Sequence, residues 1–316
     1  MRVEALDEVF VLKKVLLRII CVVLLLVSTV LILYPFISNY LMSLNDTGKI
    51  MEFENSVENI DKKTISKIFE DAKKYNVKFL GDVVITDPFD PEFQPNTDIE
   101  YENILNINND GMMGYVEIPV IDVSLPIFHG TSGEVLEKGA GHLQNTSLPV
   151  GGENSHSVIT GHTAYSAAKL FTDINQLILG DVFYIHVLDQ TLAYEVDNIK
   201  VVLPNETNDL RIVMGEDLVT LVTCTPYGIN SHRLLVRGKR IPYEKTEEKV
   251  IVNDRVIEST WMKEYKFALK IGGSILISIV LIFVIVRLLL KRKRRKKAKI
   301  SSLPAKMIDE NSSKTE

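Results

Sequence analysis

The chain has 316 residues, of which 46% are hydrophobic and 24% are charged, and it carries a formal net charge of −5 at pH 7. This acidic balance argues against nucleic-acid binding, which relies on an excess of Lys and Arg to meet the phosphates. The length allows one large or two small folded domains in addition to membrane segments.

An apolar run near the start of the chain predicts a membrane anchor. Residues 19–37 carry no charge, and at ~1.5 Å per helical residue this run spans the ~30 Å hydrocarbon core of a bilayer. A signal peptide would end at small residues, whereas Tyr34-Pro35-Phe36 stands at that point. We therefore expect an uncleaved transmembrane helix at 19–37, after a cytoplasmic N-terminus at 1–18.

A second apolar run, 271–290, is interrupted only by Arg287, which is close enough to the end to reach the interface. Basic residues precede the first run at 13–18 and follow the second at 291–297. Because positive charge favours the cytoplasmic side, we expect both termini inside and residues 38–266 outside. The basic tail, 291–316, would also contact anionic lipid headgroups.

The outer part of the chain contains one thiol. The chain has two cysteines, and Cys21 lies within the first apolar run, so Cys224 has no disulfide partner outside the membrane. Compartments outside the membrane commonly oxidise thiols. Either Cys224 is buried and inert, or its chemistry requires a free thiol.

The outer segment begins with a predicted helix at 56–75, inside a juxtamembrane segment at 38–80. Ile65, Ile68, Phe69 and Ala72 follow helical spacing and form one apolar stripe. Such a helix would connect the anchor to the folded domain.

Residues 81–97 contain Asp87-Pro88-Phe89 followed by two more X-Pro pairs. Each Pro disfavours helix at the residue before it. Composition favours a linker. The alternative is an ordered loop that lies over another part of the protein, with Phe89 and Phe93 inserted as plugs.

Residues 98–242 predict one mainly β domain, closed or sandwiched, because many short β-rich runs are separated by Gly and Pro. A linker at 243–270 follows it. The predicted strands are 115–118, 121–123, 157–160, 182–187, 192–203, 218–224 and 233–237, and 167–179 is a predicted short helix. The sequence contains no internal repeat, no Gly-rich phosphate loop and no paired Cys-x-x-Cys spacing.

Cys224 ends one predicted strand and Arg233 begins the next. If these strands are antiparallel neighbours, the two side chains lie close together. A guanidinium beside a thiol can lower the thiol pKa from about 8.5, and it can hydrogen-bond an oxyanion. Alternatively, Cys224 is a small buried side chain and Arg233 is a surface charge without a catalytic role. The residues alone do not decide between these two interpretations.

A cysteine nucleophile also needs a base. The chain has six histidines: His129, His142, His156, His162, His186 and His232. His162 is the best local candidate because it follows a predicted strand and Gly161, which lets the chain turn at the strand edge. His142 also follows a Gly and His232 adjoins Arg233, so the choice stays open on these grounds.

The stretch of residues 220–236, TLVTCTPYGINSHRLLV, resembles the signature of sortases, most closely class C, the pilin-polymerising branch. Supporting similarity lies at 139–142, 146–149, 158–162, 169–173 and 180–183. The resemblance covers about residues 56–242 and the two-anchor layout. One departure is Thr163-Ala164-Tyr165, where class C members often have Arg-Gly, which puts local substrate contacts in doubt.

The resemblance implies an eight-stranded sortase β-barrel with short helices, an N-terminal helical segment and two transmembrane helices. It assigns Cys224 as nucleophile, His162 as general acid/base and Arg233 as oxyanion stabiliser. Asp87-Pro88-Phe89 resembles the class C lid, with Asp87 paired to Arg233 and the Phe89 ring over Cys224. This implication reverses the preference for a linker at 81–97.

The implied reaction is transpeptidation at the membrane surface of a Gram-positive cell. The partners would be surface proteins with an LPxTG-like sorting motif and an amine acceptor, typically a pilin Lys, with no metal or organic cofactor. Alternatives are attachment of proteins to a cell-wall precursor, a membrane-bound cysteine peptidase that uses water, and a non-enzymatic tethered scaffold with a buried Cys224.

Overall fold

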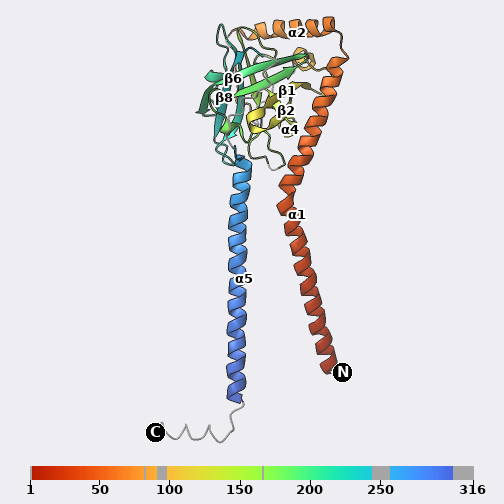
Figure 1. Cartoon of the computed structure of the whole chain (residues 1–316), viewed down its shortest axis with the longest axis vertical. Coiled ribbons are helices and arrows are strands. Elements are labelled where there is room, and N and C mark those ends of the chain that lie inside the picture. Colours follow the sequence, from red (N-terminus) through yellow and green to blue (C-terminus); the bar gives the residue numbers. More distant parts are fainter. Residues whose placement is uncertain (1, 82, 91–97, 166, 244–256, 302–316) are drawn as a thin grey trace. The chain divides into compact units, whose positions relative to one another are not determined.

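The computed structural model describes residues 2–81, 83–90, 98–165, 167–243 and 257–301. The chain divides into two compact units, Met1–Trp261 and Met262–Glu316. The first unit contains the N-terminal helices and a β-barrel, and the second contains most of the last helix (Figure 1).

Two helices have the length and apolar character needed to cross a membrane, Arg18–Glu58 and Thr260–Arg292, and each contains an 18-residue stretch with a mean hydropathy of 2.8. They are parts of α1 (Arg2–Glu58) and α5 (Thr260–Ser301). The two predicted apolar helices are therefore present. The segment predicted as a linker at 243–270 is helical from Thr260 onward, and its residues 244–256 lie outside the described ranges.

The helix predicted at 56–75 is wrong at its start, because residues 56–58 still belong to α1. The next helix, α2, covers Lys62–Asn76. The side chain of Asp61 accepts the backbone N–H groups of Lys63 and Thr64, each at 3.0 Å. This N-cap satisfies donors that a helix start leaves unpaired, so a new helix begins after Asp61. The predicted apolar stripe is buried at Ile65, Phe69 and Ala72.

Eight strands form a closed barrel in the order β1-β2-β3-β4-β7-β8-β6-β5, which confirms the predicted fold (Figure 1). The β2–β3 and β4–β7 pairs are parallel and the other pairs are antiparallel. The strands are β1 (Met112–Ile118), β2 (Val123–His129), β3 (Ala140–His142), β4 (Ser155–Thr160), β5 (Val182–Val187), β6 (Gln190–Val202), β7 (Asp217–Thr225) and β8 (His232–Ile241).

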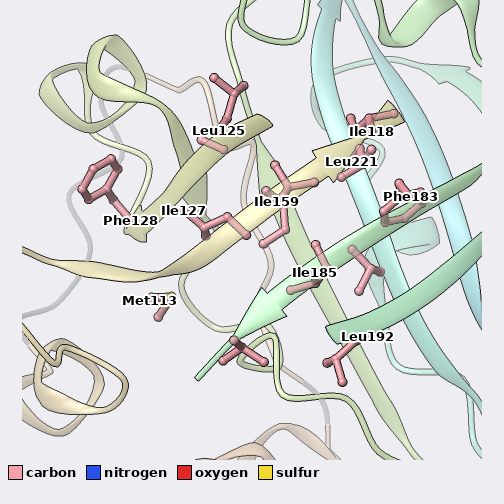
Figure 2. Packing of buried hydrophobic residues seen from close by; sticks show 14 of the residues in the cluster. Met113, Ile118, Leu125, Ile127, Phe128, Ile159, Phe183, Ile185, Leu192 and Leu221 are labelled. Atoms are coloured by element: carbon pink, nitrogen blue, oxygen red, sulfur yellow. The ribbon is translucent and has the colours of Figure 1, made fainter. Parts of the chain in front are cut away.

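Short helices lie before the first strand and between the strands. They are α3 (Ile99–Asn103), α4 (Gly133–Lys138), η1 (Val77–Phe79), η2 (Pro119–Ile121), η3 (Ile174–Gln176) and η4 (Asn208–Leu210). Apolar side chains from most of the strands fill the barrel, as Figure 2 shows for Ile127, Ile159 and Leu221, all with 0% exposure. Alternation along each strand sends every second side chain into this core.

Two predicted elements are wrong. The helix predicted at 167–179 is reduced to η3, because Leu170 adopts the left-handed region (φ 41°) and interrupts any helical path. The strand predicted at 121–123 is mostly a turn. There η2 ends at Ile121, its C-cap Asp122 is also left-handed (φ 51°), and β2 begins only at Val123.

Candidate active site

The pairing of β7 with β8 brings Cys224 and Arg233 together. They are direct partners in the antiparallel register of the two strands. Both are largely buried, with exposures of 8% for Cys224 and 9% for Arg233. The juxtaposition expected from the sequence is therefore present, because the chain turns between the two strands at residues 226–231.

The parallel pairing of β4 with β7 places His162 at the same barrel edge. Thr160 lies opposite Val222, and the Gly161 N–H donates to the Val222 carbonyl at 3.0 Å. The Thr223 hydroxyl donates to the Gly161 carbonyl at 2.7 Å. Because parallel strands run in register, His162 follows the end of β4 at the level of Cys224.

Gly161 is required for this geometry. A Cβ at this position would lie 2.6 Å from Cγ of Phe171, far inside van der Waals contact. The Phe171 ring therefore packs directly on the backbone next to His162. The sequence predicts a sharp backbone turn at Gly161, whereas the structure needs Gly there because two segments approach each other closely.

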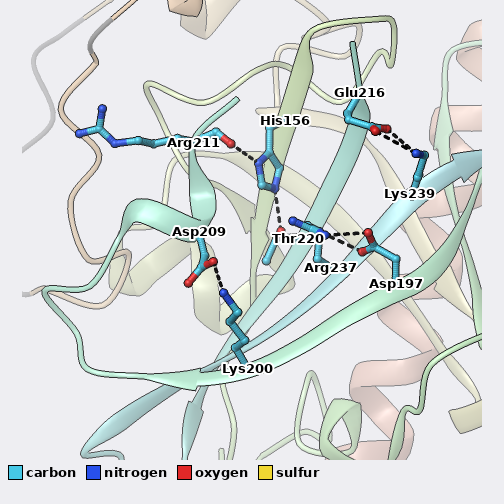
Figure 3. Close-up of polar contacts among 9 residues, drawn as sticks. All are labelled: His156, Asp197, Lys200, Asp209, Arg211, Glu216, Thr220, Arg237 and Lys239. Carbon is cyan, nitrogen blue, oxygen red and sulfur yellow. Dashed lines mark hydrogen bonds and ion pairs between the residues drawn. The ribbon is translucent and has the colours of Figure 1, made fainter. Parts of the chain in front are cut away.

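The other five histidines make hydrogen bonds with groups other than Cys224. His142 and His156 have 0% exposure, and His156 joins the loop before β7 to the barrel (Figure 3). The contacts are His129 with the Gly111 and Ile104 carbonyls, His142 with the Tyr101 hydroxyl and the Ser147 carbonyl, His156 with the Arg211 carbonyl and the Thr220 hydroxyl, His186 with Glu117 and Thr191, and His232 with Ser231.

The His162 ring lies instead among aromatic rings. Its centroid is 5.7 Å from that of Phe89 and 6.0 Å from that of Tyr165. Tyr165 was not singled out as a site residue, although it is part of the Thr163-Ala164-Tyr165 departure from the class C pattern. The only signal in the sequence was its position three residues after His162.

Asp87 and Arg233 form a bidentate ion pair. Nε of Arg233 donates to Oδ1 of Asp87 at 2.8 Å, and Nη2 donates to Oδ2 at 2.6 Å. Nη1 donates to the backbone carbonyls of Asn230 and His232 at 3.0 and 3.1 Å. Both side chains of the ion pair are nearly buried, at 12% and 10% exposure. Two parallel charge-assisted bonds fix a guanidinium firmly, so Asp87 occupies the donors of Arg233.

Phe89 packs on the same edge of the barrel. Its ring centroid is 5.1 Å from Cζ of Arg233, and the ring joins an apolar cluster with Val222 and Leu235. Residues 87–89 are therefore packed against the barrel rather than extended in solvent, unlike a linker. The second predicted plug, Phe93, lies outside the described residues.

The electrostatics of the thiol differ from the expectation. Burial raises the pKa of the Cys224 thiol to about 11, Arg233 lowers it, and the Asp87 carboxylate raises it further. The predicted effect of Arg233 is present but smaller than the cost of burying a thiolate. Burial also lowers the pKa of His162, against a weaker opposing effect of Glu137. With Asp87 in place, the thiol and the imidazole are both neutral at pH 7.

A thiol, an imidazole and a guanidinium at one barrel edge supply the three functions of acyl transfer: a nucleophile, a proton carrier and an oxyanion donor. Among the described residues, no group of three or more His, Cys, Asp or Glu side chains is arranged to hold a metal ion. Glu137, on α4, was not suggested as a site residue by any motif.

Comparison with known proteins agrees with an acyl-transfer enzyme that uses a cysteine nucleophile. The sortase domain family matches residues 116–241. The structure of sortase C from Streptococcus pneumoniae is 48% identical with a TM-score of 0.57, over 62% of this chain and 97% of that one. The structure of sortase C-1 from Actinomyces oris is 52% identical with a TM-score of 0.55, over 57% and 99%.

Sortase D from Bacillus subtilis is 30% identical over 131 residues, which is 40% of this chain, and the chain spans 63% of the length of that relative. The fold, the domain match and the identities lead to one conclusion. The chain belongs to the sortase family of cysteine transpeptidases, and the solved structures named above are class C sortases.

Proposed function

We propose that this protein joins pilin subunits covalently at the outer face of the cell membrane, with Cys224 as nucleophile. The thiolate attacks the Thr carbonyl of an LPxTG-like motif, and the Thr–Gly bond breaks as a thioester forms. The neutral His162 takes the proton of the Cys224 thiol, which generates this thiolate, and then gives that proton to the leaving glycine amine. It then removes a proton from an incoming pilin Lys amine, which attacks the thioester and releases the thiol.

Arg233 stabilises the oxyanion of both tetrahedral intermediates. Its position directly opposite Cys224 in the β7–β8 register is the observation that carries the proposal. A guanidinium beside the attacked carbonyl supplies hydrogen bonds where negative charge develops. Asp87 occupies those donors at rest, so the segment at 87–89 acts as a lid that must leave before substrate enters.

Pilin polymerisation, rather than another sortase reaction, is supported by the class C relatives. The Streptococcus pneumoniae sortase C structure is described in terms of pilin substrate specificity, and it is 48% identical to this chain. The lid-like contact of Asp87 with Arg233 and the second apolar helix add to this support. Exclusion of water under a lid would also favour the amine over hydrolysis of the thioester.

The proposed topology places residues 38–266 outside, with both termini in the cytoplasm and both apolar helices across the membrane. The basic residues at 13–18 and 291–297 support this orientation. Substrates with their own membrane anchors would share the same surface, which raises the rate of encounter.

A deletion strain tests the function directly. Complementation with the wild-type chain should restore high-mass covalent pilin polymers, and Cys224→Ala should not. Monomeric protein linked to cell-wall fragments would instead support the wall-anchoring sortase. A purified chain that releases only a free carboxylate, with or without added amine, would support a cysteine peptidase. Full polymer formation by Cys224→Ala would refute the catalytic role of this thiol.

A further inference from the structure

A short turn at residues 169–173 holds the backbone around His162. The N–H of Phe171 donates to the His162 carbonyl at 3.0 Å. The N–H of Ala164 donates to the Thr172 hydroxyl at 3.3 Å. The position of the imidazole therefore depends on where this turn lies.

The turn also forms a hydrogen bond with α1, just after the N-terminal apolar run. The backbone N–H of Lys169 donates to Oδ1 of Asn39 in α1 at 2.9 Å. Asn39 lies two residues after the predicted span at 19–37 and is half-buried. The ammonium of Lys169 donates to the Ile121 carbonyl at 2.6 Å and forms an ion pair with Asp173 at 3.1 Å.

The other end of the turn is held by Asp173. Its Oδ1 accepts the backbone N–H of Thr260 at 2.7 Å, and Asp173 itself has 0% exposure. A buried carboxylate is costly unless it is paired and hydrogen-bonded. Lys169 and Thr260 supply those partners, so the turn is fixed from both ends and Asn39 is its contact with α1.

We propose that Asn39 is a positioning residue for His162, which it acts on through the hydrogen bond to Lys169 and the 169–173 turn. The inference rests on the proposed catalytic role of His162. One hydrogen bond makes only a small net contribution to the stability of the fold. A displacement of a catalytic group by about 1 Å, however, can lower a rate by as much as 10²-fold. Asn39 therefore affects turnover more than folding.

The test compares two contacts between α1 and the barrel in the full-length chain, reconstituted in lipid nanodiscs. Asn39→Ala removes the acceptor for Lys169. Glu54→Ala is the matched control, because Glu54 accepts the Tyr115 hydroxyl at 2.6 Å on β1, away from the turn. Asn39→Asp keeps an acceptor oxygen at the same place. The measurements are kcat and KM for transfer of a sorting-motif peptide to an amine.

We expect Asn39→Ala to lower kcat roughly tenfold with KM unchanged, and the amide of Lys169 to exchange faster with solvent. Glu54→Ala and Asn39→Asp should keep kcat within about twofold of wild type. Equal kcat values for Asn39→Ala and Glu54→Ala would overturn the inference. So would a loss in both variants with a matching fall in Tm. Undiminished transfer by His162→Ala would refute the proposed function instead, since that outcome is independent of Asn39.

Discussion

At rest the thiol of Cys224 and the imidazole of His162 are uncharged, and the charged guanidinium of Arg233 is paired with Asp87. The guanidinium of Arg233 donates to both carboxylate oxygens of Asp87 and to two backbone carbonyls, and burial raises the pKa of the Cys224 thiol to about 11. The proposed transpeptidation needs a thiolate and a free guanidinium. Departure of Asp87 frees the donors that it holds on Arg233 and removes a negative charge that raises the pKa of the thiol, an effect smaller than that of burial.

Asp87→Ala is therefore expected to lower the pKa of the Cys224 thiol below 11. The substitution removes a carboxylate that raises this pKa, and it leaves Arg233, which lowers it. Each unit of decrease gives about tenfold more thiolate at a pH below the pKa. The pH dependence of the alkylation rate of the native protein measures the midpoint.

Asp197→Ala is the control for that measurement. Asp197 forms a similar bidentate pair with Arg237, at 2.9 and 2.7 Å, on the outer face of the barrel (Figure 3). It should leave the thiol midpoint unchanged. An Asp87→Ala midpoint equal to that of wild type would show that the lid carboxylate does not control the thiol.

Phe89→Ala should increase both thiol labelling and peptide cleavage. The ring contacts Arg233 and His162, so its removal lets water reach the site. Burial lowers the pKa of His162, and hydration should therefore raise it toward its ordinary value. Histidine-ring NMR on the full chain reports that pKa. Labelling rates and a His162 pKa identical to those of wild type would contradict the lid.

At this scale the sequence predicted the partners but not their charge states. Strand alternation and a nine-residue spacing were enough to bring Cys224 close to Arg233, because β7 and β8 are adjacent in the chain. The thiol pKa depends on Asp87, which is far away in the sequence and reaches the site only through packing. The positions of Asp87 and Cys224 in the sequence do not show how deeply the folded protein buries the thiol.

Among the strands, two buried histidines make the barrel sensitive to acid. Burial lowers the pKa of His142 to about 3 and of His156 to about 4. In the unfolded chain both titrate near 6.5. Their stabilising effect is thus complete above pH 6.5, and it is lost as the pH falls toward the folded values, since only the unfolded state gains protons there.

The Tm should accordingly fall as the pH decreases from 6.5 to 4. The slope from each histidine approaches about 1.4 kcal/mol per pH unit. Calorimetry of wild type and His156→Gln measures it, because Gln does not titrate in this window. The variant should start less stable and show a flatter pH dependence. Parallel curves for the two proteins would contradict the assignment.

Elements were predictable where they are long and regular. β5 was predicted at its observed bounds, and β6, β7 and β8 were predicted within a few residues. β3 was missed because three residues flanked by glycine have no readable alternation. The helix predicted at 167–179 failed because its apolar residues serve the turn that packs on His162, a tertiary demand that local periodicity does not contain.

For the whole molecule, the orientation of the termini is the main open prediction. A membrane-impermeant thiol reagent on intact cells should label Asn205→Cys, on the outer domain, but not Ser312→Cys, near the end of the basic tail. Both substitutions are made with Cys224→Ala, and Ser312→Cys should become reactive once the membrane is permeabilised. Immediate labelling of Ser312→Cys would place the C-terminus outside and overturn the topology.

The central claim is that Cys224 carries the acyl group between two substrates. Mass spectrometry of the full-length chain, quenched at acid pH after mixing with an LPxTG-type peptide, tests it most directly. We expect a thioester on Cys224 that lacks the glycine and the residues beyond it, and that disappears when a pilin Lys amine is added. Turnover of the peptide without any adduct on Cys224, or an equal rate in Cys224→Ala, would contradict it.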